Sequence, residues 1–364
     1  MNIVEEYMFN QHMKNLDDRF EDFSRECMSM QSPESLSIIL STDIHYIRKY
    51  ALYIPSYYKL KEMVDFSGYI GADLLAVLGD IVDGNTTIKR QYRDIYDCIG
   101  LLKNSKSQSV LLSKGNHDGC EWYAYENRLE PGNYLSAEDW YIHSINPLRV
   151  QYPMTLDENN VAGGYYYIDN PMQKIRVINL NTSDTVAVLD EDGCLTREYC
   201  NHWRMGLSEK QLHWLVKALT FEEKGWSVVF MSHAFLKDVF DRGEVISNGD
   251  IAWNIIKAFK NKEKGTLENK EKYYESKVEF DFTNNNSYDV LLYLFGHEHK
   301  DLCLEQDGIT VVSSENISPN AAKWDDPSVK ITGGWDFAVI EKKTRTFTTK
   351  RFGNESKDRM IELL

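Results

Sequence analysis

The sequence predicts an α/β fold in which parallel strands alternate with helices, and two observations lead to that class. Short apolar runs with few polar breaks, the clearest at residues 74–78, are typical of strands that are buried on both faces. Stretches with apolar residues at helical spacing separate the first three of these runs. A strand, helix, strand order implies right-handed crossovers and a parallel sheet, and all carboxyl strand ends then share one edge.

The N-terminal stretch, residues 1–34, is predicted to be a helical segment. Its apolar residues recur mostly three or four positions apart, namely Val4, Met8, Leu16, Phe20, Phe23 and Cys27. Such a helix either docks on the rest of the chain or acts as an arm through which a homo-oligomer forms. Residues 35–354 are predicted to form a single domain with insertions at about 119–205 and 240–287, although 364 residues would also suit two domains.

The elements of this domain are expected from local patterns. Buried strands are predicted at 36–42, 74–80, 110–113, 164–169, 175–181, 226–231 and 290–295. Helices are predicted at 55–66, at 87–102 and after Ser208, where Ser208 and Gln211 form a capping box. Shorter alternating runs at 308–313, 335–341 and 345–351 predict antiparallel strands that complete a second sheet.

The stretch 255–280 carries seven lysines and five glutamates. Mixed charge at this density predicts a solvated helical face. The alternative is that this insertion forms part of a lid over the site, because long insertions are often functional.

Polar side chains follow five of the apolar runs at the point where each run ends. They are Asp43 and His45, then Asp80, then Asn116, His117 and Asp118, then His233, and finally His297 and His299. Carboxylate, imidazole and amide ligands without a thiolate suit Mn²⁺, Fe or Zn²⁺, and their number suits two ions, which Asp80 would bridge. His143 and His202 lack partners at ligand spacing and are expected to be surface or hydrogen-bonded histidines, and His213 is expected to be solvated.

Five motifs in this order resemble the calcineurin-like metallophosphoesterase superfamily, over roughly residues 36–350. They are Asp43-x-His45, Gly79-Asp80-x-x-Asp83-Gly84, Gly115-Asn116-His117-Asp118, Ser232-His233 and Gly296-His297-x-His299. The resemblance implies a four-layer α/β/β/α sandwich of two mixed sheets flanked by helices. It also implies two metal sites, one formed by Asp43, His45, Asp80 and His299 and the other by Asp80, Asn116, His233 and His297. We expect Mn²⁺ first, with Fe or Zn²⁺ as alternatives.

The same resemblance implies metal-dependent hydrolysis of a phosphoester. A hydroxide that bridges the two ions would be the nucleophile, and His117 would donate a proton to the leaving oxygen or contact the phosphate, with Asp118 orienting it. Asp83 and Gly84 are expected to shape the turn after Asp80. The second motif lacks the arginine of Ser/Thr protein phosphatases and the tyrosine ligand of purple acid phosphatases, so neither subfamily is expected.

The expected substrate is a phosphodiester rather than a monoester, because monoester dianions usually need extra cationic groups and no motif contains an arginine. Arg48 or Lys114 could supply such a cation. The aromatic residues Trp122, Tyr123 and Tyr125 could stack on a base or sugar, or belong to the core. The alternatives are a phosphomonoesterase for a small metabolite, a nuclease, and a non-catalytic binding or assembly protein.

Composition limits the partners and the location. A net charge of −15 argues for a small phosphoester substrate and against extended nucleic acid, which usually leaves a basic footprint. Six cysteines without a Cys-x-x-Cys pair, and an N-terminus without the regions of a signal peptide, predict a cytoplasmic protein. No apolar run approaches the length of about 18 residues that a membrane span needs, so no membrane association is expected.

Overall fold

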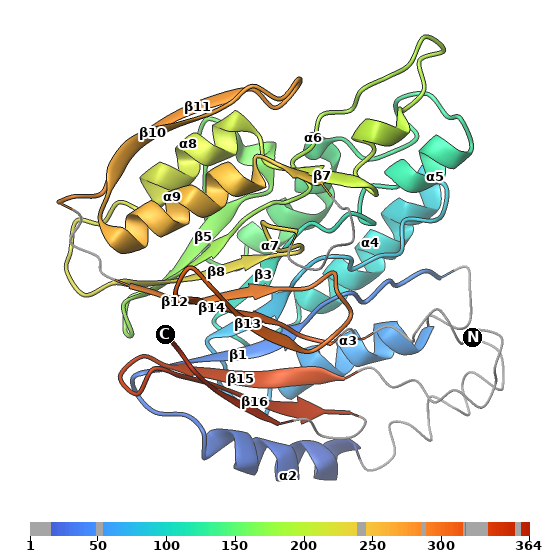
Figure 1. Cartoon of the computed structure of the whole chain (residues 1–364). Coiled ribbons are helices and arrows are strands. Elements are labelled where there is room, and N and C mark those ends of the chain that lie inside the picture. Colours follow the sequence, from blue (N-terminus) through green and yellow to red (C-terminus); the bar gives the residue numbers. More distant parts are fainter. Residues whose placement is uncertain are drawn as a thin grey trace, which may run out of the picture.

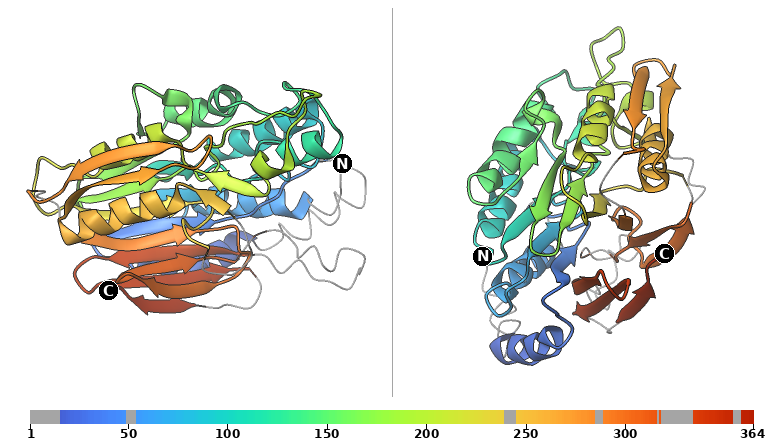
Figure 2. Two further views of the ribbon diagram at one scale, coloured as in Figure 1. Left: turned by 45° about the horizontal axis from the view of Figure 1, so that its top comes forward. Right: turned by 90° about the vertical axis from the view of Figure 1, so that its left-hand side faces the viewer.

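The computed structural model describes residues 16–48, 54–238, 245–284, 289–315, 317, 334–353 and 358–364. In this part of the chain, sheets of six and seven strands lie face to face, and helices cover the outer face of each (Figure 1, Figure 2). Two pairs of short strands form smaller sheets beside them. The predicted class, an α/β/β/α sandwich of two mixed sheets, is confirmed.

The first sheet is built on three parallel strands connected by helices. These are β1 (Ser35–Ser41), β2 (Leu74–Val77) and β3 (Ser109–Leu112), with α3 (Ile54–Phe66) and α4 (Ile88–Leu102) as crossovers. On the other side of β1 the sheet continues with antiparallel strands, in the order β15 (Trp335–Glu341), β16 (Thr346–Phe352) and β17 (Arg359–Glu362). The prediction that the last two runs complete the second sheet is wrong, because the free edge of β1 pairs with β15.

The second sheet has a parallel centre and antiparallel edges. Its central strands, in spatial order, are β14 (Ile309–Ser313), β12 (Asp289–Phe295), β8 (Ser227–Ser232) and β6 (Ile175–Asn179). Antiparallel strands flank this centre, with β13 (Leu302–Gln306) beside β14, and β5 (Tyr166–Asn170) and β4 (Thr155–Leu156) beside β6. Both sheets therefore have parallel strands that end at a common edge.

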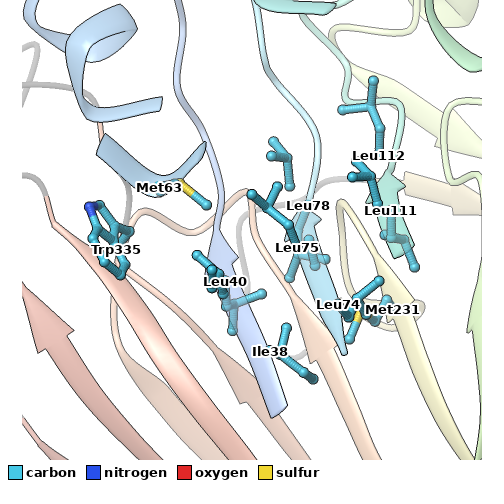
Figure 3. Close-up of a cluster of buried hydrophobic side chains, with 14 of the residues drawn as sticks. Ile38, Leu40, Met63, Leu74, Leu75, Leu78, Leu111, Leu112, Met231 and Trp335 are labelled. Carbon is cyan, nitrogen blue, oxygen red and sulfur yellow. The ribbon is translucent and has the colours of Figure 1, made fainter. Parts of the chain in front are cut away.

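Side-chain alternation along the strands separates the inner core from the outer one. Along β8, Val229 and Met231 join the cluster that contains the core between the sheets, where Met231 lies beside Leu74 of β2 (Figure 3). Val228 and Phe230 belong instead to the cluster beneath α8 (Glu209–Ala218) and α9 (Gly249–Asn261). A strand buried on both faces needs apolar residues throughout, which explains the uninterrupted apolar runs of the sequence.

The N-terminal helix α2 (Leu16–Met28) packs on the first sheet. Phe20 and Phe23 lie within 5.2 Å and 5.1 Å of the Phe352 ring, measured between ring centroids, and Phe23 meets Trp335 edge to face at 5.6 Å. Docking of the helix on the rest of the chain is therefore confirmed for residues 16–28. Val4 and Met8 lie outside the described residues, and a role of this helix in oligomer formation stays a prediction.

The lysine- and glutamate-rich insertion is only partly helical. Helix α9 ends at Asn261, and a hairpin of β10 (Lys264–Asn269) and β11 (Ser276–Asp281) follows. The hairpin lies over α8 and α9 (Figure 1). The predicted helical face is wrong for residues 264–281, because buried Ser276 and Val278 alternate with exposed charged residues in β11, a period of two that the charge density conceals. The lid role of this insertion stays a prediction.

The insertion at 119–205 contains short helices and turns between the strands named above. They are α5 (Glu121–Glu126), α6 (Ala137–Trp140), a π-helix (Tyr141–Ile145), α7 (Asn146–Arg149), and 3₁₀ turns at Val161–Gly163 and Arg197–Tyr199. After it, β7 (Arg204–Gly206) pairs with β9 (Val245–Ser247). Among the described residues, none of the helices combines the length and apolarity needed to cross a bilayer.

A buried arginine joins the two sheets near their C-terminal strands. The Arg351 guanidinium, with 2% of its side chain exposed, donates to Asp336 of β15 at 2.8 Å, and to Asp301 (2.7 Å) and Glu315 (2.9 Å), which follow strands of the second sheet. Arg359 lies 3.4 Å from both Asp301 and Asp336. Each of these three carboxylates thus has a guanidinium partner.

We expect Arg351→Met to lower the free energy of unfolding by about 3–5 kcal/mol, because it removes the guanidinium that pairs with all three carboxylates, and Arg359 is a more distant partner of Asp301 and Asp336. Urea unfolding at pH 7 measures the change. Arg149→Met, at an exposed arginine, is the control and should stay within about 0.5 kcal/mol of the wild type. Equal stability of both variants would show that the carboxylates are hydrated and not held by Arg351.

Candidate metal centre

The residues expected to bind metal lie at the edge of the sandwich where the parallel strands end. Asp43, Asp80 and Asn116 follow β1, β2 and β3 of the first sheet, and His233 and His297 follow β8 and β12 of the second. Each therefore comes from a short segment anchored by a buried strand. Residues more than 250 positions apart are brought together because the two sheets end at the same level.

Hydrogen bonds between the sheets hold these segments at a fixed separation. The backbone N–H of His297 donates to Asp43 Oδ2 (2.9 Å). His233 Nδ1 donates to the backbone carbonyl oxygen of Leu78 (2.8 Å), just after β2. A histidine whose Nδ1–H is held by a carbonyl presents the lone pair of Nε2, which is the usual arrangement for a histidine that binds a metal ion.

Asp43, His45 and His299 form the first cluster. The Nε2 atom of His299 lies 3.2 Å from Asp43 Oδ1 and 3.2 Å from the Nε2 atom of His45. The other carboxylate oxygen of Asp43 accepts hydrogen bonds from the Thr42 hydroxyl (2.6 Å) and from the His297 N–H. Asp43 Oδ1 is buried and faces His299 Nε2, so a cation bound between the two atoms would satisfy this oxygen.

Asp80, Asn116, His233 and His297 form the second cluster. The Nε2 atom of His233 lies 2.9 Å from Asn116 Oδ1, 3.2 Å from His297 Nδ1 and 3.3 Å from Asp80 Oδ2. These atoms can all present lone pairs toward one point. Ligand atoms bonded to one ion at about 2.0–2.2 Å lie about 3 Å from one another, so the spacing fits a single divalent ion.

Asp80 lies between the two clusters. Its Oδ2 atom is 3.3 Å from His233 Nε2 in the second cluster and 3.7 Å from His45 Nε2 in the first. Its Oδ1 atom accepts a hydrogen bond from the backbone N–H of His117 (2.8 Å), which fixes the carboxylate plane. One carboxylate shared by two ligand sets is the arrangement that a dinuclear site needs.

The electrostatics of the clusters favour bound positive charge. Burial lowers the pKa of His233, but Asp80 and Asp43 raise it more, and the result is about 10. Burial raises the pKa of Asp80, but His233, His117 and His45 lower it well below the usual value of an aspartate. Both pKa shifts have one cause, because a buried carboxylate and a cationic imidazole beside it stabilise each other's charge. A divalent ion at each cluster would satisfy the same demand.

Five of the seven expected ligands have left-handed backbone conformations, although none is glycine. Their φ angles are 51° at Asp43, 47° at His45, 49° at Asp80, 68° at His297 and 54° at His299. Each such residue costs of order 1–3 kcal/mol and persists only where the surrounding structure holds it. Strain concentrated on the ligand segments is typical of a functional site.

His117 lies beside the first cluster, with its ring centroid 4.6 Å from that of His45. Its Nδ1 donates to the backbone carbonyl oxygen of Asp83 (2.7 Å), which leaves Nε2 for a substrate. Asp83 Oδ1 accepts from Asn85 N (3.2 Å), as expected for a residue that shapes the turn, and its Oδ2 lies 4.0 Å from His45 Nδ1. That distance is too long for a hydrogen bond, so Asp83 acts on His117 through its carbonyl and on the turn through Oδ1.

Asp118 has a different position from the one expected. Its carboxylate accepts hydrogen bonds from the backbone N–H groups of Gly115 (2.7 Å), Asp80 (3.1 Å) and Val82 (3.2 Å). The expectation that Asp118 orients His117 is wrong, because its oxygens are directed at these amides and Asp83 holds the His117 ring. Asp118 instead ties the loop after β3 to the loop that carries Asp80.

His202 reaches the centre, although its sequence pattern indicates a surface or hydrogen-bonded histidine. Its ring centroid is 4.9 Å from that of His117, and its Nδ1 lies 3.4 Å from Asn116 Nδ2. Trp122 stacks on the His202 ring at 4.5 Å with an interplanar angle of 10°. The only signal in the sequence is the aromatic density of the 119–205 insertion. His143, by contrast, contacts Tyr96 away from the clusters, at 2.7 Å from the hydroxyl.

The remaining expectations concern two cations, one histidine and two tyrosines. Arg48 is exposed and lies 3.6 Å from Asp97, whereas Lys114 is buried. Half of the His213 side chain is exposed, as expected. Tyr125 meets Trp203 edge to face at 5.0 Å, and both Tyr123 and Tyr125 are half-buried.

Comparison with known proteins gives one family and several similar folds. Residues 36–301 match the calcineurin-like phosphoesterase family, and no curated protein sequence matches the chain. A dimetal phosphatase from zebrafish (Danio rerio) is similar in structure, with 17% identity, 90% of this chain and 99% of that chain covered, and a TM-score of 0.58. The structure of a protein from Thermus thermophilus also matches, with 13% identity, 87% of this chain and 98% of that chain covered, and a TM-score of 0.43. A purple acid phosphatase from yellow lupin (Lupinus luteus) seeds matches with 12% identity, 90% of this chain and 53% of that chain covered, and a TM-score of 0.46.

Gly115 provides a test of how closely the loops must approach. A Cβ atom at this position would lie 2.0 Å from Asp80 Oδ1 and 2.3 Å from Asp80 N, so Gly115→Ala must displace Asp80. We expect about 10- to 100-fold weaker Mn²⁺ binding in calorimetric titration, the size of effect that supporting residues around metal ligands produce. Gly71→Ala is the control, since nothing lies within 4 Å of its Cβ. Equal affinity in both variants would mean that Asp80 does not bind the metal.

Proposed function

The chain belongs to the calcineurin-like phosphoesterase family and is a metal-dependent hydrolase of phosphoester bonds, and we propose that its substrate is a small phosphodiester. The observation that carries the two-ion chemistry of this proposal is the position of Asp80, whose Oδ2 faces both ligand clusters. We propose that Asp43, His45, Asp80 and His299 hold one divalent ion and Asp80, Asn116, His233 and His297 the other. Mn²⁺ is the first choice, because carboxylate and amide oxygens with imidazoles suit it.

The residues around the clusters have distinct proposed roles. When bound, the two ions acidify a water molecule and neutralise charge on the phosphoryl oxygens. His117, held through Nδ1 by the Asp83 carbonyl, can donate a proton from Nε2 to the leaving oxygen when it is an imidazolium. Asp118 holds the Asp80 loop in place, and the Leu78 carbonyl orients the His233 ring.

Charge near the centre supports a diester over a monoester. A phosphomonoester dianion usually needs cationic side chains in addition to metals. Arg48 is exposed and pairs with Asp97, and Lys114 lines the cavity described below and belongs to neither ligand cluster. The net charge of −15 supports a small substrate rather than extended nucleic acid. We also propose that the protein lies in the cytoplasm and that it forms a homo-oligomer through the N-terminal helix.

The substrate class is tested with bis(p-nitrophenyl) phosphate and p-nitrophenyl phosphate, assayed side by side with the Mn²⁺-loaded protein. We expect a higher kcat/KM for the diester. Asp80→Asn should lower kcat/KM for both esters by at least about 100-fold, since several kcal/mol of stabilisation by the ions depend on this carboxylate. A preference for the monoester would overturn the proposed substrate class, and an active Asp80→Asn variant would overturn the shared ligand.

The role of His117 is tested by varying the leaving group. If His117 is a general acid, His117→Ala should reduce kcat for diphenyl phosphate by about 10²–10⁴-fold and for bis(p-nitrophenyl) phosphate much less, because p-nitrophenolate leaves without protonation. His143→Ala, at a histidine paired with Tyr96 away from the clusters, is the matched control and should behave as wild type. An equal loss for both esters would assign His117 to phosphate binding instead.

A further inference from the structure

A cavity of about 280 Å³, here called the Asn201 pocket, lies where β3 and β6 end. Among the residues that line it are Lys114, Glu121, Trp140, Asn181, Ser183 and Asn201. Its volume is near the lower end of the range for ligand pockets, about 300–1,000 Å³, which suits one small group and not an oligomer.

The pocket continues the row of strand ends that forms the metal centre. Two hydrogen bonds connect the sheets at the metal centre. The His297 N–H, after β12, donates to Asp43, after β1, and His233 Nδ1, after β8, donates to the Leu78 carbonyl, after β2. A third connects β3 to β6, where the Ser113 hydroxyl donates to Asn179 Oδ1 (2.6 Å). Lys114 follows β3 and Asn181 follows β6, so the pocket occupies the third position of this row. Ligands in open α/β sheets bind at such strand ends.

Two residues that line the pocket, Lys114 and Asn201, are close in the sequence to residues of the metal centre. Asn201 is followed by His202, whose ring lies 4.9 Å from that of His117. Lys114 lies two residues before Asn116, one of the proposed metal ligands. A substrate whose phosphorus lies at the metal centre can therefore place an adjoining part near Asn201.

The pocket is lined by buried polar groups that lack partners. Asn201 is 1% exposed, and neither its Nδ2 nor its Oδ1 has a hydrogen-bond partner among the described residues. The same holds in that part of the chain for Ser183 Oγ, Glu121 Oε2 and Trp140 Nε1. Together they account for five of the thirteen unpaired buried side-chain atoms of the described structure. Native proteins leave few such atoms, and a ligand explains their concentration here.

The chemistry of these groups indicates the kind of ligand. An unpaired amide offers one donor and one acceptor side by side, and the edge of a nucleobase carries the complementary pair. Glu121 can accept from ring or exocyclic N–H groups, and Lys114 can donate to a ring carbonyl. Tyr134 and Tyr199 also line the pocket and provide flat aromatic surfaces.

We propose that the Asn201 pocket binds the nucleobase of a nucleotide diester whose phosphorus lies at the metal centre. This inference rests on the proposed phosphodiesterase function for its substrate, but binding of the base can be measured without catalysis. The proposal assigns Asn201 to substrate recognition through its two unpaired amide atoms. It assigns Ser183 and Glu121 to supporting hydrogen bonds with the same base.

The first test is binding to the full-length protein without metal, measured by calorimetry. Thymidine and adenosine are the probes, and methyl β-D-ribofuranoside tests the sugar alone. We expect a nucleoside to bind and Asn201→Leu to weaken it at least about 10-fold, because the apolar side chain can make neither hydrogen bond. Replacing an unpaired buried amide by an apolar group of similar size should not unfold the protein. Binding of the riboside as tightly as the nucleosides, or of neither, would overturn the proposal.

The second test compares two esters that release the same p-nitrophenol when water attacks phosphorus. The ratio of kcat/KM for thymidine 5′-(p-nitrophenyl) phosphate to that for bis(p-nitrophenyl) phosphate should fall at least about 10-fold in Asn201→Leu, and also fall in Ser183→Ala, through KM. Asn104→Leu, at an exposed asparagine just after α4, is the matched control and should keep the wild-type ratio.

The two tests separate failure of the pocket from failure of the proposed function. An unchanged ratio in Asn201→Leu would overturn the role of the pocket while phosphodiester hydrolysis stands. If the wild type hydrolyses neither ester, the proposed function fails, and nucleoside binding still decides the pocket.

Discussion

Three hydrogen bonds that cross from one sheet to the other at the carboxyl ends of the strands determine the geometry of the whole centre. They join His297 N–H to Asp43, His233 Nδ1 to the Leu78 carbonyl, and the Ser113 hydroxyl to Asn179. The apolar core between the sheets brings the strand ends close, but apolar packing is not directional. Hydrogen bonds supply the direction, because each fixes one ligand or its neighbour relative to a strand of the opposite sheet. The separation of the two ligand clusters thus depends on the packing of the sandwich.

This rigidity has a cost that appears in the backbone. Asp43, His45, Asp80, His297 and His299 all adopt positive φ angles. Such conformations are sustained because buried strands precede each segment and because Asp118 binds three backbone amides across two of the loops. Strain at the ligands is therefore offset by the core and by hydrogen bonds around them. The result is a set of donor atoms that need little rearrangement to bind ions, which is the condition for electrostatic stabilisation of a reacting phosphate.

The sequence predicts those features of the fold and the site that depend on a local pattern of residues. Each ligand segment directly follows an apolar strand, so the side chains expected to bind metal could be chosen before their contacts were known. The sheet that β15 and β16 join, by contrast, depends on which strand edge is free. The β10–β11 hairpin was missed because charged residues conceal its alternation. His202 and Asn201 could not be selected, since they lie in an irregular insertion and reach the site only through its tertiary packing. The hydrogen-bond partners of Asp118 could not be predicted either, because every residue but proline has a backbone N–H and the sequence does not show which of them a carboxylate binds.

The residues that the sequence predicts and those that it does not predict have different proposed roles. The segments that follow the first two pairs of strands, β1 with β12 and β2 with β8, carry all the carboxylates and imidazoles of the two clusters. The third pair, β3 with β6, carries one amide ligand and then opens into a cavity whose other walls come from the insertion. Changes in the loops of the insertion that line the cavity can alter it without moving the proposed metal ligands, because the cross-sheet bonds at Asp43 and at Leu78 involve no residue of the insertion. In the proposed function, bond cleavage and substrate choice thus belong to neighbouring positions on one row of strand ends.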